Sequence, residues 1–400
     1  MVGLVGLCYG ASASLGMTPP MGWMNWEVFR CNVDCEADPT NCVNAALFRA
    51  HADVLVNEGY LSAGYDTVHV DDCWMSRVRD ATGSLRGDSS RFFYGMAALG
   101  HYIHSRGLKF GLYTAESAMT CAGYPASKGR EKIDAKTFAS WGVDYLKVDG
   151  CGGLDYYATG YSSMGEALQN SGREIVYSCS WPAYIGTNES VKAWCYETMI
   201  NIGCNLWRNY ADIECNWGSL SSIIEYWGIN GHLMANYAAP GHFNDPDMLI
   251  IGNSCITDHE ARTQMAIWCI VAAPLIMGND LRLVQSSHKA ILLNDEAISI
   301  NQDALALQGR RMPSNTTEGQ IWIRYLHDGG YALGLYNPTS TPLNISFTFP
   351  ENGLAGPMLV RDIWIKQDLG LIAAGFNRTV AGHDTHFFKL IHGAFPTLSS

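Results

Sequence analysis

Two aspartates with different neighbours are the residues of this chain best suited to chemistry. Asp149 lies in the segment 145–151, and Lys147 two positions before it shares its face if the segment is a strand. Asp212 lies in the segment 206–213, four residues beyond Arg208. We expect each segment to be a strand that delivers its Asp at its C-terminal end. Two carboxyls in different electrostatic settings are what glycoside hydrolysis requires of a nucleophile and an acid/base.

Each of these residues also has a simpler interpretation. Asp149 could cap the helix that follows its strand, and Arg208 with Asp212 could form a structural ion pair. Glu214, two residues beyond Asp212, is a competing carboxyl for the acid/base role. The two segments alone leave these alternatives open.

Strand and helix patterns alternate from Thr18 to about Asp303, which indicates βα units around a parallel sheet. Such units can close into a barrel or remain an open sheet. No Gly-x-Gly-x-x-Gly follows the first strand, and polar residues end many different strands, so we favour the barrel. We expect strands at 67–70, 108–113, 145–148 and 175–178, a helix at 44–57, and left-handed residues at Gly59, Gly107 and Gly142.

Alternating patterns without helical periodicity follow Arg311. The runs 320–326 and 331–336 flank Asp328-Gly329-Gly330 as a hairpin, and 386–390 is the last strand of the series. These features predict an antiparallel β-sandwich of roughly ninety residues. We therefore expect a remnant of a signal peptide at 1–16, which lacks a basic n-region, a catalytic (β/α)₈ domain at 17–308, and an antiparallel β domain at 309–400.

Composition excludes several classes of function. A net charge of −12 and a pI near 5.4 provide no basic surface for nucleic acid or for an anionic membrane. No apolar run is long enough to span a bilayer, and no His-Glu-x-x-His, paired Cys-x-x-Cys or EF-hand motif suggests a metal. His101 and His104 fall on an expected outer helix. We expect neither a metal nor another cofactor.

Thirteen cysteines indicate an oxidising, secretory route. The alternative is that the cysteines are small buried hydrophobic residues and that the Asn-x-Ser/Thr triplets are chance matches. Those triplets, which predict glycosylation, begin at Asn188, Asn315, Asn344 and Asn377.

With the segments 21–23, 71–74 and 244–248, the two aspartate segments closely resemble the α-galactosidase/α-N-acetylgalactosaminidase family of retaining glycosidases. The resemblance runs from about Thr18 to Arg311 and more faintly beyond. It implies a (β/α)₈ barrel, a lysosomal or secreted enzyme without a cofactor, and terminal α-linked GalNAc or Gal glycans as substrates. It is compatible with a homodimer, and the sequence itself does not decide the oligomeric state.

The resemblance also implies individual roles. Asp149 corresponds to the nucleophile and Asp212 to the acid/base. Asp71-Asp72 alone could suggest a metal site or a proton-sharing dyad, whereas the family binds sugar hydroxyls there, and Met248 alone would suit a core position better. The implied substrate-binding residues are Trp26, Asp71, Asp72, Tyr113, Lys147, Ser180, Ala183, Tyr184, Arg208, Asp247 and Met248.

The family's disulfide framework maps onto eight cysteines of this chain. It implies the pairs Cys31–Cys73, Cys35–Cys42, Cys121–Cys151 and Cys179–Cys204. The sequence alone does not determine this connectivity. The sequence leaves the pairing of Cys195, Cys215, Cys255 and Cys269 open, with a bond between Cys195 and Cys215 as one alternative.

Two small residues bear on the choice of sugar. In the family, the positions of Ser180 and Ala183 contact the C2 substituent, and galactosidases carry Glu and Leu there. Ser and Ala leave room for an N-acetyl group, so we expect hydrolysis of terminal α-GalNAc with weaker action on α-galactose. The alternatives are an α-galactosidase and a catalytically silent glycan-binding protein. Thr114-Ala115-Glu116 and Phe243 depart from the family pattern without touching a catalytic position.

Overall fold

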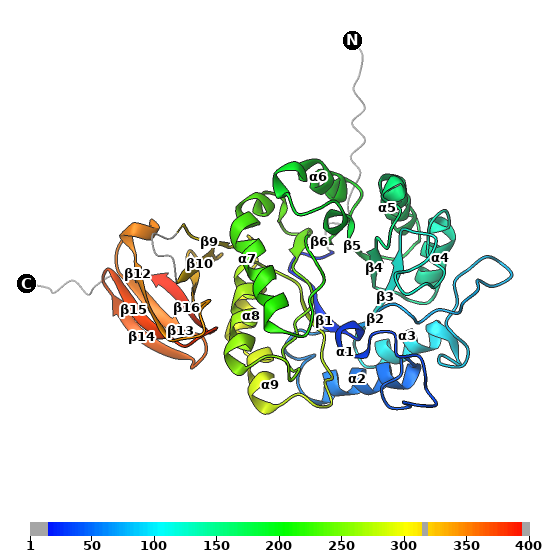
Figure 1. Ribbon diagram of the computed structural model, residues 1–400, viewed down its shortest axis with the longest axis horizontal. Helices are drawn as coiled ribbons and strands as arrows, with labels where there is room; N and C mark the ends of the chain where they lie inside the picture. Colours follow the sequence, from blue (N-terminus) through cyan, green and yellow to red (C-terminus); the bar gives the residue numbers. More distant parts are fainter. Residues whose placement is uncertain (1–14, 314–318, 394–400) are drawn as a thin grey trace, which may run out of the picture.

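The computed structural model describes residues 15–313 and 319–393. Its first part is a ring of eight parallel strands in the order β7-β6-β5-β4-β3-β2-β1-β8 (Figure 1). Leu249, just after β7, pairs in parallel with Met277 of β8 and closes the ring. The expected barrel is therefore confirmed. Its strands are β1 (Met21–Met24), β2 (Thr67–Val70), β3 (Lys109–Ala115), β4 (Tyr145–Asp149), β5 (Val176–Cys179), β6 (Leu206–Arg208), β7 (Phe243–Asp245) and β8 (Leu275–Met277).

Helices cover the outside of the ring. The helix expected at 44–57 begins one residue later, because the Asn44 side chain accepts the Leu47 N–H and caps it. In the same way Thr257 and Glu260 form a capping box at the start of α8. The α-helices are α1 (Trp26–Phe29), α2 (Ala45–Asn57), α3 (Gly95–Ser105), α4 (Glu131–Ser140), α5 (Leu154–Gln169), α6 (Ala193–Asn201), α7 (Trp217–Met234), α8 (Asp258–Ile270), α9 (Ser286–Leu292) and α10 (Asp295–Asn301), and the short 3-10 helices are η1 (Trp181–Tyr184), η2 (Glu189–Val191), η3 (Ala235–Tyr237) and η4 (Pro350–Asn352).

The barrel strands follow the sequence prediction with one exception. The four expected strands are present within one or two residues, and Gly59, Gly107 and Gly142 adopt left-handed conformations with φ of 89°, 77° and 78°. The prediction that 206–213 is a strand ending at its aspartate was wrong. β6 ends at Arg208, and Asp212 lies four residues farther along, in a loop.

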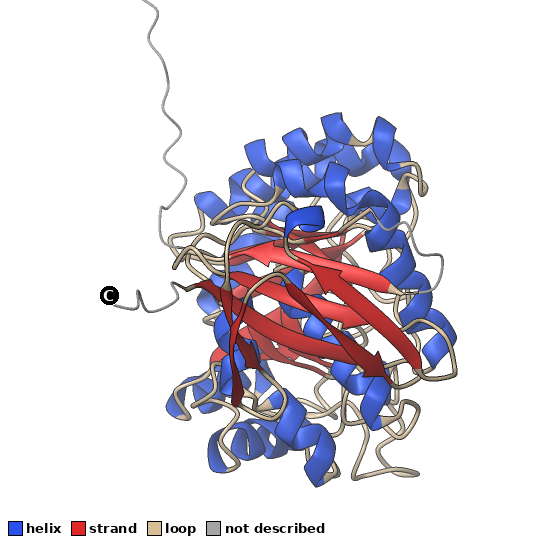
Figure 2. Cartoon of the chain, turned by 90° about the vertical axis from the view of Figure 1, so that its left-hand side faces the viewer, coloured by secondary structure: helices blue, strands red, loops and turns tan. Residues whose placement is uncertain are grey.

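The second part is antiparallel, as expected for a β-sandwich. A six-stranded sheet in the order β14-β13-β16-β11-β10-β9 faces the two-stranded sheet β12-β15 across a separate apolar core (Figure 2). The predicted hairpin is present as β10 and β11. Since β9 already pairs with β10, we propose the domain boundary at residues 308–309. The strands are β9 (Arg310–Arg311), β10 (Gln320–Tyr325), β11 (Tyr331–Tyr336), β12 (Leu343–Thr348), β13 (Met358–Asp362), β14 (Gln367–Ile372), β15 (Gly375–Val380) and β16 (Thr385–His392).

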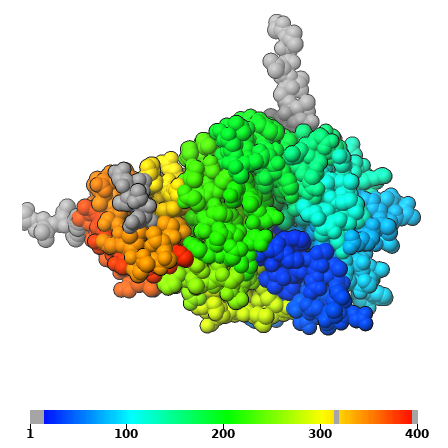
Figure 3. Space-filling model, viewed as in Figure 1, coloured from blue at the N-terminus to red at the C-terminus, as the bar shows by residue number. Residues whose placement is uncertain are grey.

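The two parts are joined by buried polar contacts. Arg324 of β10 is 1% exposed and donates to the carbonyl oxygens of Cys269 and Ile300 in the barrel, at 2.8 and 2.7 Å. Arg262 of α8 pairs with Asp384 of the β domain. The space-filling view shows the β domain in continuous contact with the flank of the barrel (Figure 3). Among the described residues, no helix combines the length and the apolar character needed to cross a membrane.

Five disulfide bonds are formed, four of which pair the cysteines as the family resemblance implies. The alternative of a bond between Cys195 and Cys215 is not formed. Cys215 bonds to Cys255, which ties the loop after β6 to the loop after β7, while Cys195 is a free thiol buried in α6.

Glu116, one of the departures from the family pattern, is a buried carboxyl behind the end of β3. Its residue is 0% exposed, and neither carboxyl oxygen has a hydrogen-bond partner among the described residues. Gly160 of α5 makes room for this side chain, because a Cβ there would collide with Oε2. Burial, with smaller contributions from Glu131 and Asp134, raises the pKa of Glu116 well above its usual value. The carboxyl is therefore held protonated.

We expect this proton to make the fold less stable as the pH rises. A folded-state pKa above the unfolded value of 4.5 means that the folded chain binds more protons, so the free energy of unfolding falls above about pH 4.5. Glu116→Met should increase stability near pH 7 by about 1–3 kcal/mol, the usual cost of an unpaired buried polar group, and by less at pH 4.

The measurement is the thermal midpoint of wild type and variants between pH 4 and 8. Glu116→Gln keeps a buried polar group but cannot ionise, so it should remove the pH dependence of this site without the full gain of the Met variant. Parallel midpoint curves for wild type and Glu116→Gln would show that Glu116 does not titrate in this range.

Candidate active site

A cavity of about 190 Å³ opens where β4, β5 and β6 end. This is the C-terminal face of the barrel, where barrel enzymes carry their active sites. Six predicted residues line it together, including both aspartates. Tyr210 and Ala211 were not predicted, although they lie between the two predicted residues Arg208 and Asp212. The lining consists of Asp149, Ser180, Ala183, Tyr184, Arg208, Tyr210, Ala211 and Asp212.

Asp149 is held by hydrogen bonds from three directions. Its Oδ1 accepts from the Tyr184 hydroxyl at 2.6 Å and from the Gly150 N–H at 2.8 Å. Its Oδ2 accepts from the Tyr113 hydroxyl at 3.2 Å. These donors orient a carboxylate that is half-buried at the end of β4. A fixed and partly desolvated carboxylate suits a nucleophile.

Asp212 has a more open setting. Its side chain is 76% exposed, and Oδ1 pairs with the Arg208 guanidinium at 3.0 Å. The structural ion pair considered from the sequence is therefore present, and the residue also lines the cavity. Arg208, itself buried, lowers the pKa of Asp212. Glu214 is not among the residues that line this cavity.

Arg208 is shared between two carboxyls. The same Nη2 atom lies 3.0 Å from Asp247 Oδ2, which also accepts the Ile213 N–H. Burial of Asp247 raises its pKa to about 6, although Arg208 opposes the shift. Burial works against the charge of Arg208, but the Asp247 and Asp212 carboxylates outweigh it and raise the guanidinium pKa. Arg208 therefore remains charged and fixed between the two aspartates.

Lys147 bonds to a different carboxylate from the one expected. The sequence suggested Asp149 as its neighbour, but Nζ donates to Asp71 Oδ2 at 2.8 Å and lies 5.3 Å from the centre of the Tyr113 ring. Burial disfavours the ammonium, yet the Asp71, Asp149 and Asp247 carboxylates raise its pKa overall. Lys147 thus places a permanent positive charge among the acidic residues of this face.

Asp71 and Asp72 are fully buried and directly follow β2. Asp72 accepts the Cys73 and Ala122 N–H groups, and Asp71 accepts the Asp72 N–H. Burial raises the pKa of Asp72. Their oxygens therefore face fixed donors and can accept further hydrogen bonds only in set directions.

The turn after β5 carries the residues expected to contact the C2 substituent. Ser180 is 3% exposed and precedes η1, which contains Ala183 and Tyr184. The Trp181 ring stacks on Tyr161 at 5.9 Å and fixes the turn from behind. Ser180 and Ala183, which line the cavity together with Tyr184, are therefore small side chains on a turn that is held in place.

Trp26 and Met248 lie outside the cavity lining. Trp26 is half-buried at the start of α1, with the Arg30 guanidinium 5.6 Å from its ring centre. Met248 is 3% exposed and follows Asp247, which suits the core position considered from the sequence. Within the described part of the chain, neither residue has a hydrogen bond or ion pair with Asp149 or Asp212.

Left-handed backbone marks the ends of three barrel strands. Cys73, Cys151 and Asp247 have φ of 70°, 56° and 88°. Such conformations are costly for residues other than glycine and persist where surrounding structure enforces them. Cys73 and Cys151 are held by their disulfide bonds to Cys31 and Cys121. The bonds therefore fix the turns that present Asp72 and Asp149.

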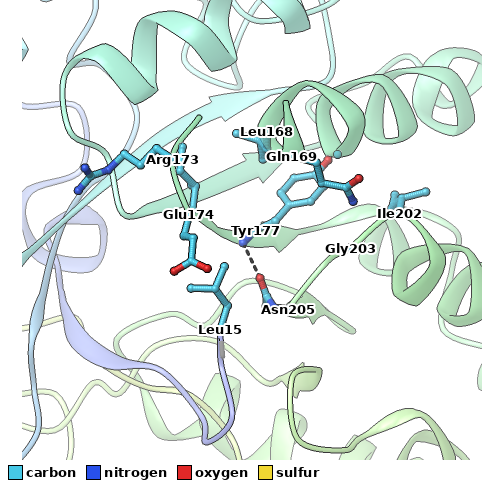
Figure 4. A pocket seen from close by; sticks show the side chains of 11 residues that line it. Leu15, Leu168, Gln169, Arg173, Glu174, Tyr177, Ile202, Gly203 and Asn205 are labelled. Carbon is cyan, nitrogen blue, oxygen red and sulfur yellow. Dashed lines mark hydrogen bonds between the residues drawn. The ribbon is translucent and has the colours of Figure 1, made fainter. Parts of the chain in front are cut away.

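A second cavity, of about 220 Å³, lies at the opposite end of the barrel. Figure 4 shows Tyr177 with Leu15, Leu168 and Asn205 around it, and the Tyr177 N–H donates to Asn205 Oδ1 at 3.0 Å. Most of its residues precede β5 or β6, so this cavity is at the N-terminal face of the barrel, where residues usually serve stability rather than catalysis.

Three glycosylation triplets are on the surface. Asn188 is exposed in the loop before η2, and Asn344 and Asn377 are exposed on β12 and β15. Asn315 lies outside the described residues. Among the described residues, the cluster with the spacing of metal ligands is Cys121, Asp149 and Cys151, and its two sulfurs are joined as a disulfide.

Comparisons with known proteins agree with this geometry. Residues 18–303 match the family model described as "Alpha galactosidase A", and residues 316–390 match the "Alpha galactosidase C-terminal beta sandwich domain". The chain is 42% identical to α-N-acetylgalactosaminidase of Gallus gallus over 372 residues, 92% of this chain and 91% of the relative. It is 44% identical to α-galactosidase A of Homo sapiens over 325 residues, 81% of this chain and 75% of the relative.

A solved structure extends the agreement to three dimensions. The crystal structure of α-galactosidase I from Mortierella vinacea superposes with a TM-score of 0.84 at 29% identity, covering 95% of this chain and 98% of the other. The barrel, the paired aspartates at its C-terminal face and the matched domains lead to one assignment. The chain is a glycoside hydrolase and belongs to the α-galactosidase/α-N-acetylgalactosaminidase family, glycoside hydrolase family 27.

Proposed function

We propose that this enzyme removes terminal α-linked N-acetylgalactosamine, and α-galactose more weakly, by a double displacement with retention of configuration. The observation that carries the choice of sugar is that Ser180 and Ala183 line the same cavity as Asp149 and Asp212. Their small side chains leave volume beside the nucleophile for an N-acetyl group. The Ser180 hydroxyl can bond to the acetyl carbonyl, and the Ala183 methyl can contact the acetyl methyl.

In the first step Asp149 attacks the anomeric carbon while Asp212 gives its proton to the leaving oxygen. The bond to the leaving group breaks, and a covalent glycosyl-enzyme forms. In the second step Asp212, now a carboxylate, takes a proton from water, and that water displaces Asp149. Position in the cavity lining supports Asp212 over Glu214 as the acid/base. The anomer released at early times, followed by NMR, tests retention.

Other predicted residues bind the sugar in this proposal. Asp71 and Asp72 accept sugar hydroxyls, Lys147 holds Asp71, and Tyr113 and Tyr184 orient the nucleophile. Arg208 and Asp247 form the wall beside Asp212. Trp26 and Met248, to which the family resemblance gives a sugar contact, lie outside the cavity lining. A lysosomal or secreted location is supported by the five disulfide bonds, which persist in oxidising compartments.

α-Galactosidase is the second candidate function. The human relative of that name is as similar to this chain as the N-acetylgalactosaminidase of chicken, at 44% against 42% identity. Galactose lacks the acetamido group but shares every other contact. Paired assays with nitrophenyl α-GalNAc and nitrophenyl α-galactoside therefore separate the two activities.

Exchange of the two small residues tests whether Ser180 and Ala183 select the substituent on C2 of the sugar. Ser180→Glu with Ala183→Leu fills the space beside C2 and should exclude the N-acetyl group. Overpacking of a preformed pocket typically costs about 1–3 kcal/mol, so the ratio of kcat/KM for α-galactoside over α-GalNAc should rise roughly ten- to a hundredfold or more.

Both substrates present the same hydroxyls to Asp71 and Asp72. The ratio of the two kcat/KM values therefore serves as its own control. A loss of folded enzyme lowers both values equally and leaves the ratio unchanged. Ala183→Leu alone should give an intermediate shift. A constant ratio in a folded double variant would show that another part of the enzyme contacts the C2 substituent.

A further inference from the structure

The loop that carries Asp212 is secured from behind as well as from the active site. Residues 209–212 follow the end of β6, and the Asp212 side chain is 76% exposed with Arg208 as its ion-pair partner. On the barrel side, Asp247 accepts the Ile213 N–H at 2.9 Å. An exposed carboxyl on a loop keeps a fixed position only if the backbone beneath it is fixed. The contacts on the outer side of this loop therefore matter for its function.

Those contacts come from a fully buried ion pair. Lys192 Nζ lies 2.8 Å from Glu189 Oε1, and both side chains are 0% exposed. Glu189 belongs to η2 and Lys192 precedes α6, next to α7 (Figure 1). The Glu189 carboxylate also accepts hydrogen bonds from the hydroxyls of Tyr196 and Tyr226. Neither charged residue lines the catalytic cavity.

Three contacts connect this network to the loop. Lys192 Nζ donates to the Asn209 carbonyl oxygen at 3.1 Å. Asn209 Nδ2 donates to the Tyr196 hydroxyl at 2.9 Å, which ties the side chain of the same residue to the network. The Tyr226 ring stacks on the Tyr210 ring at 4.0 Å with an interplanar angle of 16°. The network thus holds the two residues that immediately follow Arg208.

A buried ion pair is poor evidence for a stabilising role, because desolvation of both charges offsets their attraction and apolar residues would often stabilise as well. What distinguishes this pair is direction, since Lys192 donates to Asn209, and the two tyrosines that donate to Glu189 contact Asn209 and Tyr210. We propose that Glu189 and Lys192 are positioning residues that hold the loop of Asp212, and so place the acid/base against the leaving group. The inference rests on the proposed role of Asp212 as the acid.

The test replaces both charges at once. Glu189→Gln with Lys192→Met keeps similar side-chain volumes and leaves no unpaired buried charge. A misplaced acid should slow cleavage of leaving groups that need a proton. We expect kcat/KM for methyl α-GalNAc to fall about ten- to a hundredfold, and that for dinitrophenyl α-GalNAc, whose phenolate leaves unaided, to fall less than about threefold.

A second variant keeps the proposal testable if the double variant does not fold. Tyr226→Phe removes one hydroxyl from Glu189 but retains the ring that stacks on Tyr210. It should lower kcat/KM for the methyl glycoside roughly three- to tenfold, with the same preference for the activated substrate. Tyr226→Leu also removes the stacking and should lower it further.

The matched control neutralises a buried pair elsewhere. Arg79 and Asp134 form an ion pair at 2.6 Å, with the Asp134 side chain 0% exposed, between the loop after β2 and α4. Arg79→Met with Asp134→Asn should alter stability but reduce the two kcat/KM values equally. This control separates a general loss of folded structure from a loss of acid positioning.

Asp212→Asn, measured beside these variants, distinguishes the two possible failures. If it shows no dependence on the leaving group, Asp212 is not the acid, and the inference falls with that assignment. If it shows the dependence while Glu189→Gln with Lys192→Met and Tyr226→Phe slow both substrates equally or not at all, the ion pair is structural and only the positioning role is refuted.

Discussion

Asp149→Asn is expected to lower kcat by at least about 10⁴-fold while the enzyme remains folded. An amide has nearly the shape of the carboxylate and can keep hydrogen bonds to Tyr113, Tyr184 and the Gly150 N–H with modest adjustment. It cannot attack the anomeric carbon, so the covalent intermediate does not form. Loss of a nucleophile elsewhere in enzymology produces effects of this order or greater.

The measurement is kcat for both nitrophenyl substrates, with circular dichroism and the thermal midpoint as evidence of folding. Asp155→Asn is the matched control, since Asp155 is an exposed aspartate in the first turn of α5 outside the cavity lining. It should retain wild-type activity. Activity of Asp149→Asn close to that of wild type would remove Asp149 from the mechanism.

Asp212→Asn is expected to lower kcat/KM for methyl α-GalNAc by about 10²–10⁴-fold, the usual contribution of a general acid. Dinitrophenyl α-GalNAc should lose much less in the first step, because its leaving group needs no proton. Glu214→Gln is the control for the competing carboxyl. It should not produce a loss of kcat/KM that depends on the leaving group. Equal losses for both substrates in Asp212→Asn would contradict its role as the acid.

The same residue predicts the direction of the pH dependence. Asp212 must be protonated for the first step, and Arg208 lowers its pKa, so the active fraction grows as the pH falls. In wild type, kcat/KM for the methyl glycoside should therefore decline from acidic toward neutral pH. The pH at which kcat/KM declines reflects the interacting carboxyls of Asp212 and Asp247 together rather than one residue. An alkaline maximum would contradict the assignment.

Local patterns predicted most of the elements. Apolar residues that repeat every two positions identified the strand at 67–70, and those that repeat about every 3.6 positions identified the helix that Asn44 caps. Both patterns work because side-chain direction follows from backbone geometry. The prediction of a strand over 206–213 was wrong because β7 offers a pairing partner only as far as Arg208. Strand length is decided by the neighbouring strand, which local sequence does not contain.

The disulfide bonds also divide into those inferred from the sequence and one that only the structure shows. Four pairs followed from resemblance to a family, whereas Cys215–Cys255 joins loops that are 40 residues apart in sequence and meet only after the barrel closes. Cys195 lies closer to Cys215 in sequence but is enclosed within α6. Proximity along the chain was therefore a poor guide, because disulfide pairing depends on distance in space.

The motifs of the sequence and their resemblance to a family determined the reaction class and identified Asp149, Asp212 and the small residues beside them, which line one cavity in the structure. Such motifs depend on residue type and on adjacent residues. Only the tertiary structure decided which donors hold each aspartate. Lys147 bonds to Asp71 rather than to Asp149 of the same strand, and the loop of Asp212 contacts a buried ion pair from another element. The physical reason is that hydrogen bonds and charge interactions act over a few ångströms in space, and folding brings together groups from strands and loops distant in sequence.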